Sequence, residues 1–217
     1  MLKNIYFWCI ILTILTIACD GPFQPFVASV GKELNPINAG DIYIYDVYSV
    51  NSSSYAGVSK VEWIYDEDTI IDGVVMYPQH RYAYNQSGGF VWYLQTYHAQ
   101  DDFGFYNYQT YPHDEYPIPY LRYPIYVGRK WQLKRKNGFF LQSYNQVKGE
   151  VLSLEDVDSY QDCWKISLKL SNSDDETYPV WEIIQYYQKD LGMVKMEYTV
   201  GSTYVRLSLL EKRSSKD

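Results

Sequence analysis

Short runs in which apolar and polar residues alternate recur along the chain, and they predict β-strands. Between residues 164 and 170, Trp, Ile, Leu and Leu alternate with Lys, Ser and Lys, which puts the apolar side chains on one face. Similar runs are DIYIYDVYSV, KVEWIYDED, GFVWYLQTYHA, VWEIIQYYQK, MVKMEYTV and YVRLSLLEK. A period of 3.6 residues never persists for ten residues, so we expect an all-β protein with little helix, any helix being short, for example within residues 24–34.

Turn-forming residues separate these runs and predict antiparallel hairpins. The connecting segments include NSSS, NQSGG, SNSDDE and GST. The clearest signal is Asp72-Gly73 between two apolar runs, because both central residues of a type I′ turn need a positive φ. We expect a two-residue hairpin there.

One motif occurs twice. Residues 35–46 (NPINAGDIYIYD) and 123–134 (YPIYVGRKWQLK) share the pattern Pro-Ile-x-x-Gly-x-x-aromatic. Proline fixes φ before a strand, glycine makes the tight turn, and the aromatic residue begins the inward face. The pattern predicts positive φ at Gly40 and Gly128, and chance similarity in a chain rich in Tyr and Pro is the alternative.

The N-terminus carries an apolar run from residue 5 to residue 18, preceded by Lys3. This run is shorter than the roughly 20 residues that cross a bilayer, and it has the form of a secretory signal. Residues 16–19, Thr-Ile-Ala-Cys, resemble the bacterial lipobox, although Thr16 stands where leucine is usual. The resemblance implies a signal peptide over 1–18 and a lipid on Cys19; a plain secretory signal or an uncleaved core segment are the alternatives.

The cysteines leave no internal disulfide. Cys9 lies in the expected signal peptide and Cys19 is the expected lipid site, so only Cys163 remains. The alternation places Cys163 on the polar face near the start of a strand. A nucleophilic cysteine needs a lowered pKa and a histidine partner, and no histidine lies near Cys163 in the sequence, so we expect no catalytic role.

Composition narrows the class of partner. The formal net charge is −7, which argues against nucleic acid or an anionic membrane surface as an electrostatic partner. The chain has 25 tyrosines, six tryptophans and eight phenylalanines, residues that favour strands. The length after cleavage suits one domain, so we expect a lipidated N-terminus and tether over 19–34 and a single β domain over 35–217.

The repeated motif and the segment YYQKDLGMVKMEY (186–198) together resemble a broad set of uncharacterised bacterial lipoproteins. These carry Pro-[Leu/Ile]-x-x-Gly-x-x-Trp near the mature N-terminus and again in mid-chain, and end in a hairpin after a Gly-Val-Gly-Leu-Val-Lys-like turn. Here Asp190 replaces the first glycine of that turn. The resemblance implies a curved antiparallel sheet or half-barrel of about ten strands, similar in outline to periplasmic lipoprotein carriers, and brings no catalytic residue or cofactor.

The best candidate for a metal-binding or catalytic site is a group of residues between positions 97 and 117. It consists of His98, Asp101, Asp102, His113, Asp114 and Glu115. If a hairpin brought 98–102 against 113–115, two imidazoles and a carboxylate could bind a divalent metal. No spaced metal-binding signature supports such a site, and solvated turns explain these residues equally well. We therefore expect no metal and no catalysis, with a hydrolase in this region as the alternative.

The aromatic run 90–98 (FVWYLQTYH) suggests where a ligand could bind. Phe90, Trp92 and Leu94 share one strand face and are apolar enough for a core. The other face carries Tyr93, Gln95 and Tyr97. A tyrosine suits a binding surface, because its ring can be half-buried while its hydroxyl stays in contact with water. That second face is the candidate surface for a lipid, a peptide or a sugar ring.

Together these patterns predict an exported bacterial lipoprotein of the cell envelope, in the periplasm or at the cell surface. It would touch the membrane through the lipid on Cys19 and act as a non-catalytic binding or assembly module, with a lipid, a glycan or a protein as partner. Two alternatives stay open: a metal-dependent or acid/base hydrolase that uses the region from His98 to Glu115, and a purely structural envelope component.

Overall fold

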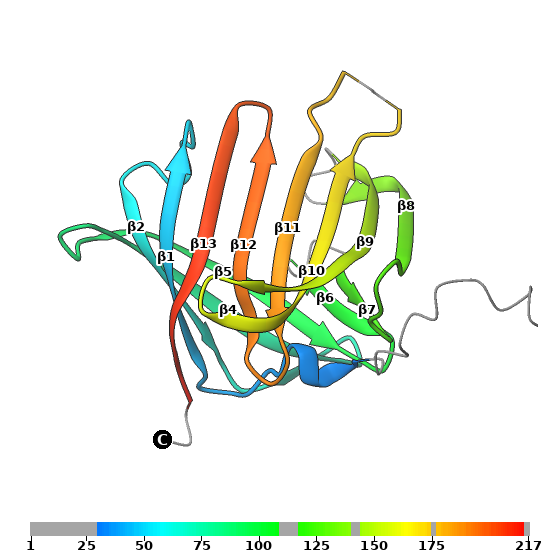
Figure 1. The fold of residues 1–217 in the computed structure, drawn as a ribbon, viewed down its shortest axis with the longest axis horizontal. Helices are drawn as coiled ribbons and strands as arrows, with labels where there is room; N and C mark the ends of the chain where they lie inside the picture. The colour runs from blue at the N-terminus through cyan, green and yellow to red at the C-terminus, as the bar shows by residue number, and fades with distance from the viewer. Residues whose placement is uncertain (1–29, 109–116, 140–143, 175–176, 215–217) are drawn as a thin grey trace, which may run out of the picture.

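The computed structural model describes residues 30–108, 117–139, 144–174 and 177–214 (Figure 1). This part of the chain forms thirteen strands and one short 3₁₀ turn, η1 (Lys32–Leu34), so the all-β prediction is confirmed. The strands are β1 (Ile42–Val50), β2 (Val58–Tyr65), β3 (Thr69–Ile71), β4 (Val74–Asn85), β5 (Phe90–Gln100), β6 (Gly104–Tyr108), β7 (Ile118–Arg122), β8 (Lys130–Phe139), β9 (Tyr144–Val157), β10 (Tyr160–Ser171), β11 (Trp181–Gln188), β12 (Gly192–Val200) and β13 (Thr203–Arg213). Within the described ranges, no helix is long and apolar enough to cross a membrane.

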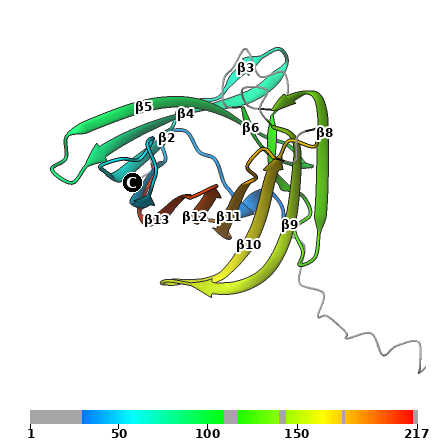
Figure 2. The same ribbon diagram turned by 90° about the horizontal axis from the view of Figure 1, so that it is seen from above.

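Twelve strands follow one another in a single antiparallel sheet that curls into a nearly closed barrel. Their order is β7-β6-β5-β4-β2-β1-β13-β12-β11-β10-β9-β8, and β3 pairs with β4 outside this path. Seen from above, β4 and β5 form one wall, and β8, β9 and β10 curl round the opposite side (Figure 2). The expected curved sheet is confirmed, and it extends further round than a half-barrel.

The two edge strands of the sheet meet at a seam. Trp131 of β8 donates its Nε1–H to the backbone oxygen of Pro119 in β7, at 3.2 Å. The Trp131 ring also lies directly over the backbone of Gly149, its cross-strand neighbour in β9. One side chain therefore connects three strands where the ladder of backbone hydrogen bonds is interrupted.

The alternation in β10 is only partly regular. Trp164, Ile166, Leu168 and Leu170 are all buried, as the sequence predicts. Cys163 is also fully buried, so its expected place on the polar face is wrong. The β9–β10 register shifts between Tyr160 and Cys163, and such a bulge breaks the period of two. Burial raises the pKa of the Cys163 thiol to about 11, which keeps it protonated at neutral pH.

The packed domain begins earlier than the predicted boundary at residue 35. Val30 forms an isolated bridge with Ile125, and Leu34 is completely buried. Both residues belong to the hydrophobic core. The last part of the expected tether is therefore part of the barrel.

The turn glycines have the predicted conformation. Gly40 has φ of 80° and Gly128 has φ of 87°, and each lies two residues before a strand, β1 or β8. Asp72 and Gly73, at φ of 51° and 79°, connect β3 to β4. Both the repeated entry turn and the two-residue hairpin are confirmed.

Valine at Gly128 is expected to lower the free energy of unfolding by about 1 kcal/mol or more, since a side chain strains a positive φ. No atom lies within 4 Å of the position that a β-carbon would take, so the cost comes from the backbone and not from a clash. Gly40→Val should cost a comparable amount. Urea unfolding followed by circular dichroism measures both.

Gly128→Asn is the matched control for this prediction, because asparagine tolerates a left-handed conformation better than valine does. It should unfold closer to wild type than Gly128→Val. If both valine variants unfold like wild type, neither motif requires a glycine to hold its turn at positive φ.

Candidate ligand cavity inside the barrel

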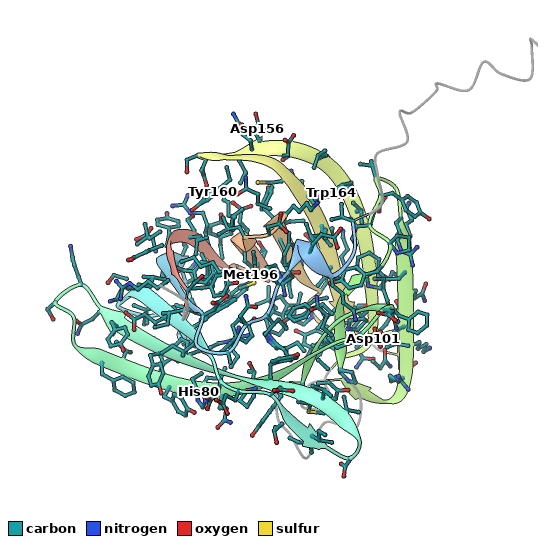
Figure 3. All side chains as sticks on the ribbon, turned by 90° about the horizontal axis from the view of Figure 1, so that it is seen from below. His80, Asp101, Asp156, Tyr160, Trp164 and Met196 are labelled. Carbon is teal, nitrogen blue, oxygen red and sulfur yellow. The ribbon has the colours of Figure 1, made fainter. Side chains whose placement is uncertain are left out.

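The barrel holds a partly open cavity of about 470 Å³. This volume is within the range of about 300–1,000 Å³ that is usual for small-molecule sites. Figure 3 shows Met196 of β12, one of the lining residues, near the middle of the ring of strands, with Asp156 and Asp101 towards its periphery. Aromatic rings from both walls line much of the cavity, among them Tyr43, Tyr45, Trp63, Tyr65, Trp92 and Tyr187.

The register between β4 and β5 determines which side chains face the cavity. Residues directly opposite in an antiparallel pair lie on the same face of the sheet. Arg81 is opposite Leu94, and Ala83 is opposite Trp92. Arg81, Leu94 and Trp92 all line the cavity, so this face of the hairpin is the inner one.

The aromatic wall is held by ring-to-ring contacts and by hydrogen bonds at its edges. The rings of Tyr45 and Trp63 lie 4.7 Å apart between centroids, and Tyr55 meets Trp92 edge-on at 5.6 Å. Tyr45 donates its hydroxyl to the backbone oxygen of Met193 at 2.9 Å. Burial raises the pKa of Tyr45 well above its ordinary value, so this hydroxyl stays protonated.

Two polar groups on the wall have unused hydrogen-bonding capacity. Gln185 is 1% exposed, and its Oε1 has no hydrogen-bond partner within the described part of the chain. Its Nε2 lies 3.9 Å from the sulfur atoms of Met193 and Met196, which are weak acceptors. The buried Nε1–H of Trp63 likewise finds no acceptor there. Buried polar groups are usually paired, so these two atoms are exceptions in the wall of the cavity.

His98, the first member of the predicted chemical cluster, faces the cavity and is 2% exposed. Asn107 donates its Nδ2–H to His98 Nε2 at 2.6 Å, and Tyr65 Oη lies 2.9 Å from Nδ1. Burial, and to a smaller extent the charge of Arg81, holds the pKa of His98 well below its usual range. The ring is therefore neutral at pH 7, with Nδ1–H donating to Tyr65.

The other described members of that cluster do not join His98. Asp101 accepts hydrogen bonds from the backbone N–H groups of Phe103 and Gly104, each at 2.8 Å, and so forms the turn before β6. Asp102 is exposed and pairs with Lys32 at 2.8 Å. No group of three or more potential metal ligands occurs within the described ranges. The remaining three members, His113, Asp114 and Glu115, lie outside the described residues, as does the expected lipid site, Cys19.

The predicted ligand face of β5 lies on the outside of the barrel. Tyr93 Oη is 2.6 Å from His80 Nδ1 and donates to Gln95 Oε1 at 3.3 Å. Gln95 Nε2 donates to Tyr97 Oη at 3.0 Å, which completes a ladder of outer side chains. Tyr93 is also among the residues that line the cavity, whereas Gln95 and Tyr97 are not. The cavity and this ladder therefore adjoin at Tyr93, while Gln95 and Tyr97 belong to the ladder alone.

The opposite face of β5 differs from the packed core that the sequence predicts. Phe90 is 62% exposed and Leu94 is 42% exposed, so the core prediction is wrong for both. This end of the inner face borders open space rather than other side chains. Trp92 lines the cavity and donates its Nε1–H to the backbone oxygen of Ser54 at 2.8 Å.

No protein-family model matches the chain, and no curated protein matches its sequence. Solved structures similar to it include a Bacteroides fragilis protein with a YmcC-like fold that is inferred to be exported, at a TM-score of 0.48 and 14% identity over 83% of this chain and 98% of that one. An inferred lipoprotein from Parabacteroides distasonis has a TM-score of 0.40 and 12% identity, over 83% and 98% of the two chains. A β-barrel-like protein of a domain of unknown function, DUF1849, from Brucella abortus has a TM-score of 0.38 and 10% identity, over 79% and 96%.

Sequence reasoning missed Arg81 and Gln185 as cavity residues. In the run YPQHRYAYN of β4, Gln79, Arg81 and Ala83 occupy alternate positions and therefore one face. Gln79 and Ala83 are completely buried, so Arg81 is a charged residue on an inner face. A charge on the inner side of a strand is an available signal for a site, but only once the inner side is known.

Proposed function

We propose that the protein is a lipid-anchored bacterial envelope lipoprotein that holds a small, largely apolar molecule inside its barrel without transforming it. The observation that carries this proposal is the 470 Å³ cavity with its aromatic wall and few polar groups. Such a combination is typical of ligand pockets, in which apolar surface supplies affinity and a few polar groups fix orientation. The aliphatic side chains of Leu94, Ile183, Met193 and Met196 in this lining suit an alkyl chain.

The anchor in this proposal is the lipid on Cys19, at the end of the lipobox-like segment. An acyl chain contributes about 0.8 kcal/mol per buried CH₂, and stable anchoring takes more than one chain. Replacing Cys19 with alanine should abolish acylation, because no other side chain of the segment offers a thiol. Metabolic labelling with a radioactive fatty acid measures this, and a variant that is labelled as strongly as wild type would exclude Cys19 as the lipid site.

Native mass spectrometry of the full chain, released from detergent micelles, tests the binding function. We expect wild type to retain a non-covalent mass of lipid size. Leu94→Trp should lose it, because Leu94 lines the cavity at a partly exposed position where a larger ring fills space without repacking a core. Leu210→Trp is the matched control, since Leu210 is 63% exposed and does not line the cavity.

Other outcomes of this measurement contradict the proposal. A bound metal ion in place of an organic mass would favour the hydrolase reading of the region from His98 to Glu115. The absence of any bound mass, together with no uptake of an added long-chain alcohol, would favour a purely structural component. Retention of the ligand by Leu94→Trp with loss in Tyr97→Ala would move the site to the outer ladder.

A further inference from the structure

Arg81 is the one lysine or arginine among the residues described as lining the cavity, and no aspartate or glutamate lines it. Its side chain projects from the inner face of β4, opposite Leu94 of β5. In the described part of the chain, no carboxylate lies within salt-bridge distance of its guanidinium group. The cavity therefore carries one positive charge with no protein counter-charge.

The guanidinium group of Arg81 is held in one orientation by its neighbours. Its Nε donates to Oε1 of Gln79, a completely buried residue, at 2.6 Å. Its central carbon lies 4.5 Å from the centroid of the Trp63 ring. Neither terminal Nη nitrogen has a protein hydrogen bond within the described ranges. The two nitrogens that recognise carboxylates best are thus unused, while the rest of the group is fixed.

Arg81 is half-buried, so its charge is only partly hydrated and a bound anion would stabilise it. A charge in an apolar, partly dehydrated space is unfavourable unless it is paired and hydrogen-bonded. His98 does not share the charge, because its ring is neutral and it is occupied by Tyr65 and Asn107. The contact with Trp63 offsets part of the cost, but it leaves the donors on both Nη atoms unmatched.

We propose that the ligand of this cavity is an amphipathic monoanion, a long-chain carboxylic acid, whose carboxylate binds the Nη atoms of Arg81 while its chain lies against the aromatic wall. This inference rests on the proposed binding function. A single guanidinium fork matches one carboxylate in geometry and in charge. A phosphate dianion would retain an unmatched charge, because no second cationic residue lines the cavity in the described chain.

The test compares two probes of equal chain length, hexadecanoate and hexadecanol, by native mass spectrometry of the full chain at pH 7.5, where a carboxylate is ionised. Wild type should prefer hexadecanoate by about tenfold or more, the size expected for hydrogen bonds to a charged group. Arg81→Met, which keeps an unbranched apolar stem but removes the guanidinium group and its charge, should lose this preference and still bind hexadecanol. Arg206→Met is the matched control, because Arg206 also lies over an aromatic ring, that of Tyr48 at 5.3 Å, but does not line the cavity.

Each outcome decides a separate claim. Equal binding of the two probes by wild type overturns the acid assignment and leaves the binding function intact. A preference that persists in Arg81→Met removes Arg81 from the site. Failure of both probes to bind wild type contradicts the proposed function and the inference together. Retained hexadecanol binding shows that Arg81→Met is folded, and the comparison of probes on wild type does not depend on any variant.

Discussion

Replacing Gly149 with alanine is expected to lower the free energy of unfolding by about 1–3 kcal/mol, the usual cost of forcing extra atoms into a packed site. Gly149 of β9 is directly opposite Trp131 of β8, and atoms of the indole ring occupy the space that a β-carbon would need. In the alanine variant the indole ring must move, although its Nε1–H is hydrogen-bonded to the backbone oxygen of Pro119 across the seam. The substitution therefore weakens both the β8–β9 contact and the closure of the barrel.

A double-mutant cycle separates the clash from the intrinsic effect of removing a glycine. Alanine at position 149 should cost much less in a Trp131→Leu background, because leucine leaves the space above the backbone open. Urea unfolding of wild type, both single variants and the double variant gives the coupling energy. If the free-energy costs of the two substitutions simply add, the position of the Trp131 ring does not require a residue without a side chain at position 149.

At pH values below 6.5, the free energy of unfolding of wild type is expected to decrease because of His98. Burial holds the pKa of this imidazole well below its ordinary value of 6.5 in the folded protein. As the pH falls, the unfolded chain therefore takes up the proton first. The stabilising contribution is fully present above pH 6.5, and it is lost by about 1.4 kcal/mol per pH unit below that value until the folded-state pKa is reached.

His98→Gln should remove this slope, because glutamine does not titrate. Urea unfolding at pH 7.5 and at pH 5.5 measures the change for each protein, so that the titration of other groups cancels in the comparison. His80→Gln is the matched control, since His80 belongs to the outer ladder of β4 and β5 and is not among the residues that line the cavity. Parallel slopes for wild type and His98→Gln would show that His98 is not held neutral by burial.

The features that the sequence predicts correctly depend on local chemistry. Alternating residues identify strands because the side-chain period of a strand is two, and Asp72-Gly73 identifies a hairpin because few residues accept its φ values. Gly40 and Gly128 belong to the same class. Cys163 is the counter-example, since a bulge before it shifts the alternation and nothing in the local pattern marks that bulge.

The closure of the sheet and the position of the cavity could not be predicted in the same way. They depend on pairings between distant strands, such as β1 with β13, and a slip of one residue in such a pairing would exchange the two faces. On β5, alternation separates Trp92 and Leu94 from Tyr93 and Tyr97 but does not say what lies beyond each face. The apolar face points inward as expected, yet it borders a cavity, and of the predicted ligand face Tyr93 reaches that cavity while Gln95 and Tyr97 do not.

A crystal structure of the full chain grown with a bromine-labelled hexadecanoate tests the central claim most directly, because the anomalous signal of bromine places the chain of the ligand without interpretation of weak density. The account predicts a bromine peak inside the barrel, among the rings that line the cavity, with the carboxylate at Arg81. A peak beside Gln95 and Tyr97 on the outer ladder, with an empty interior, would contradict it.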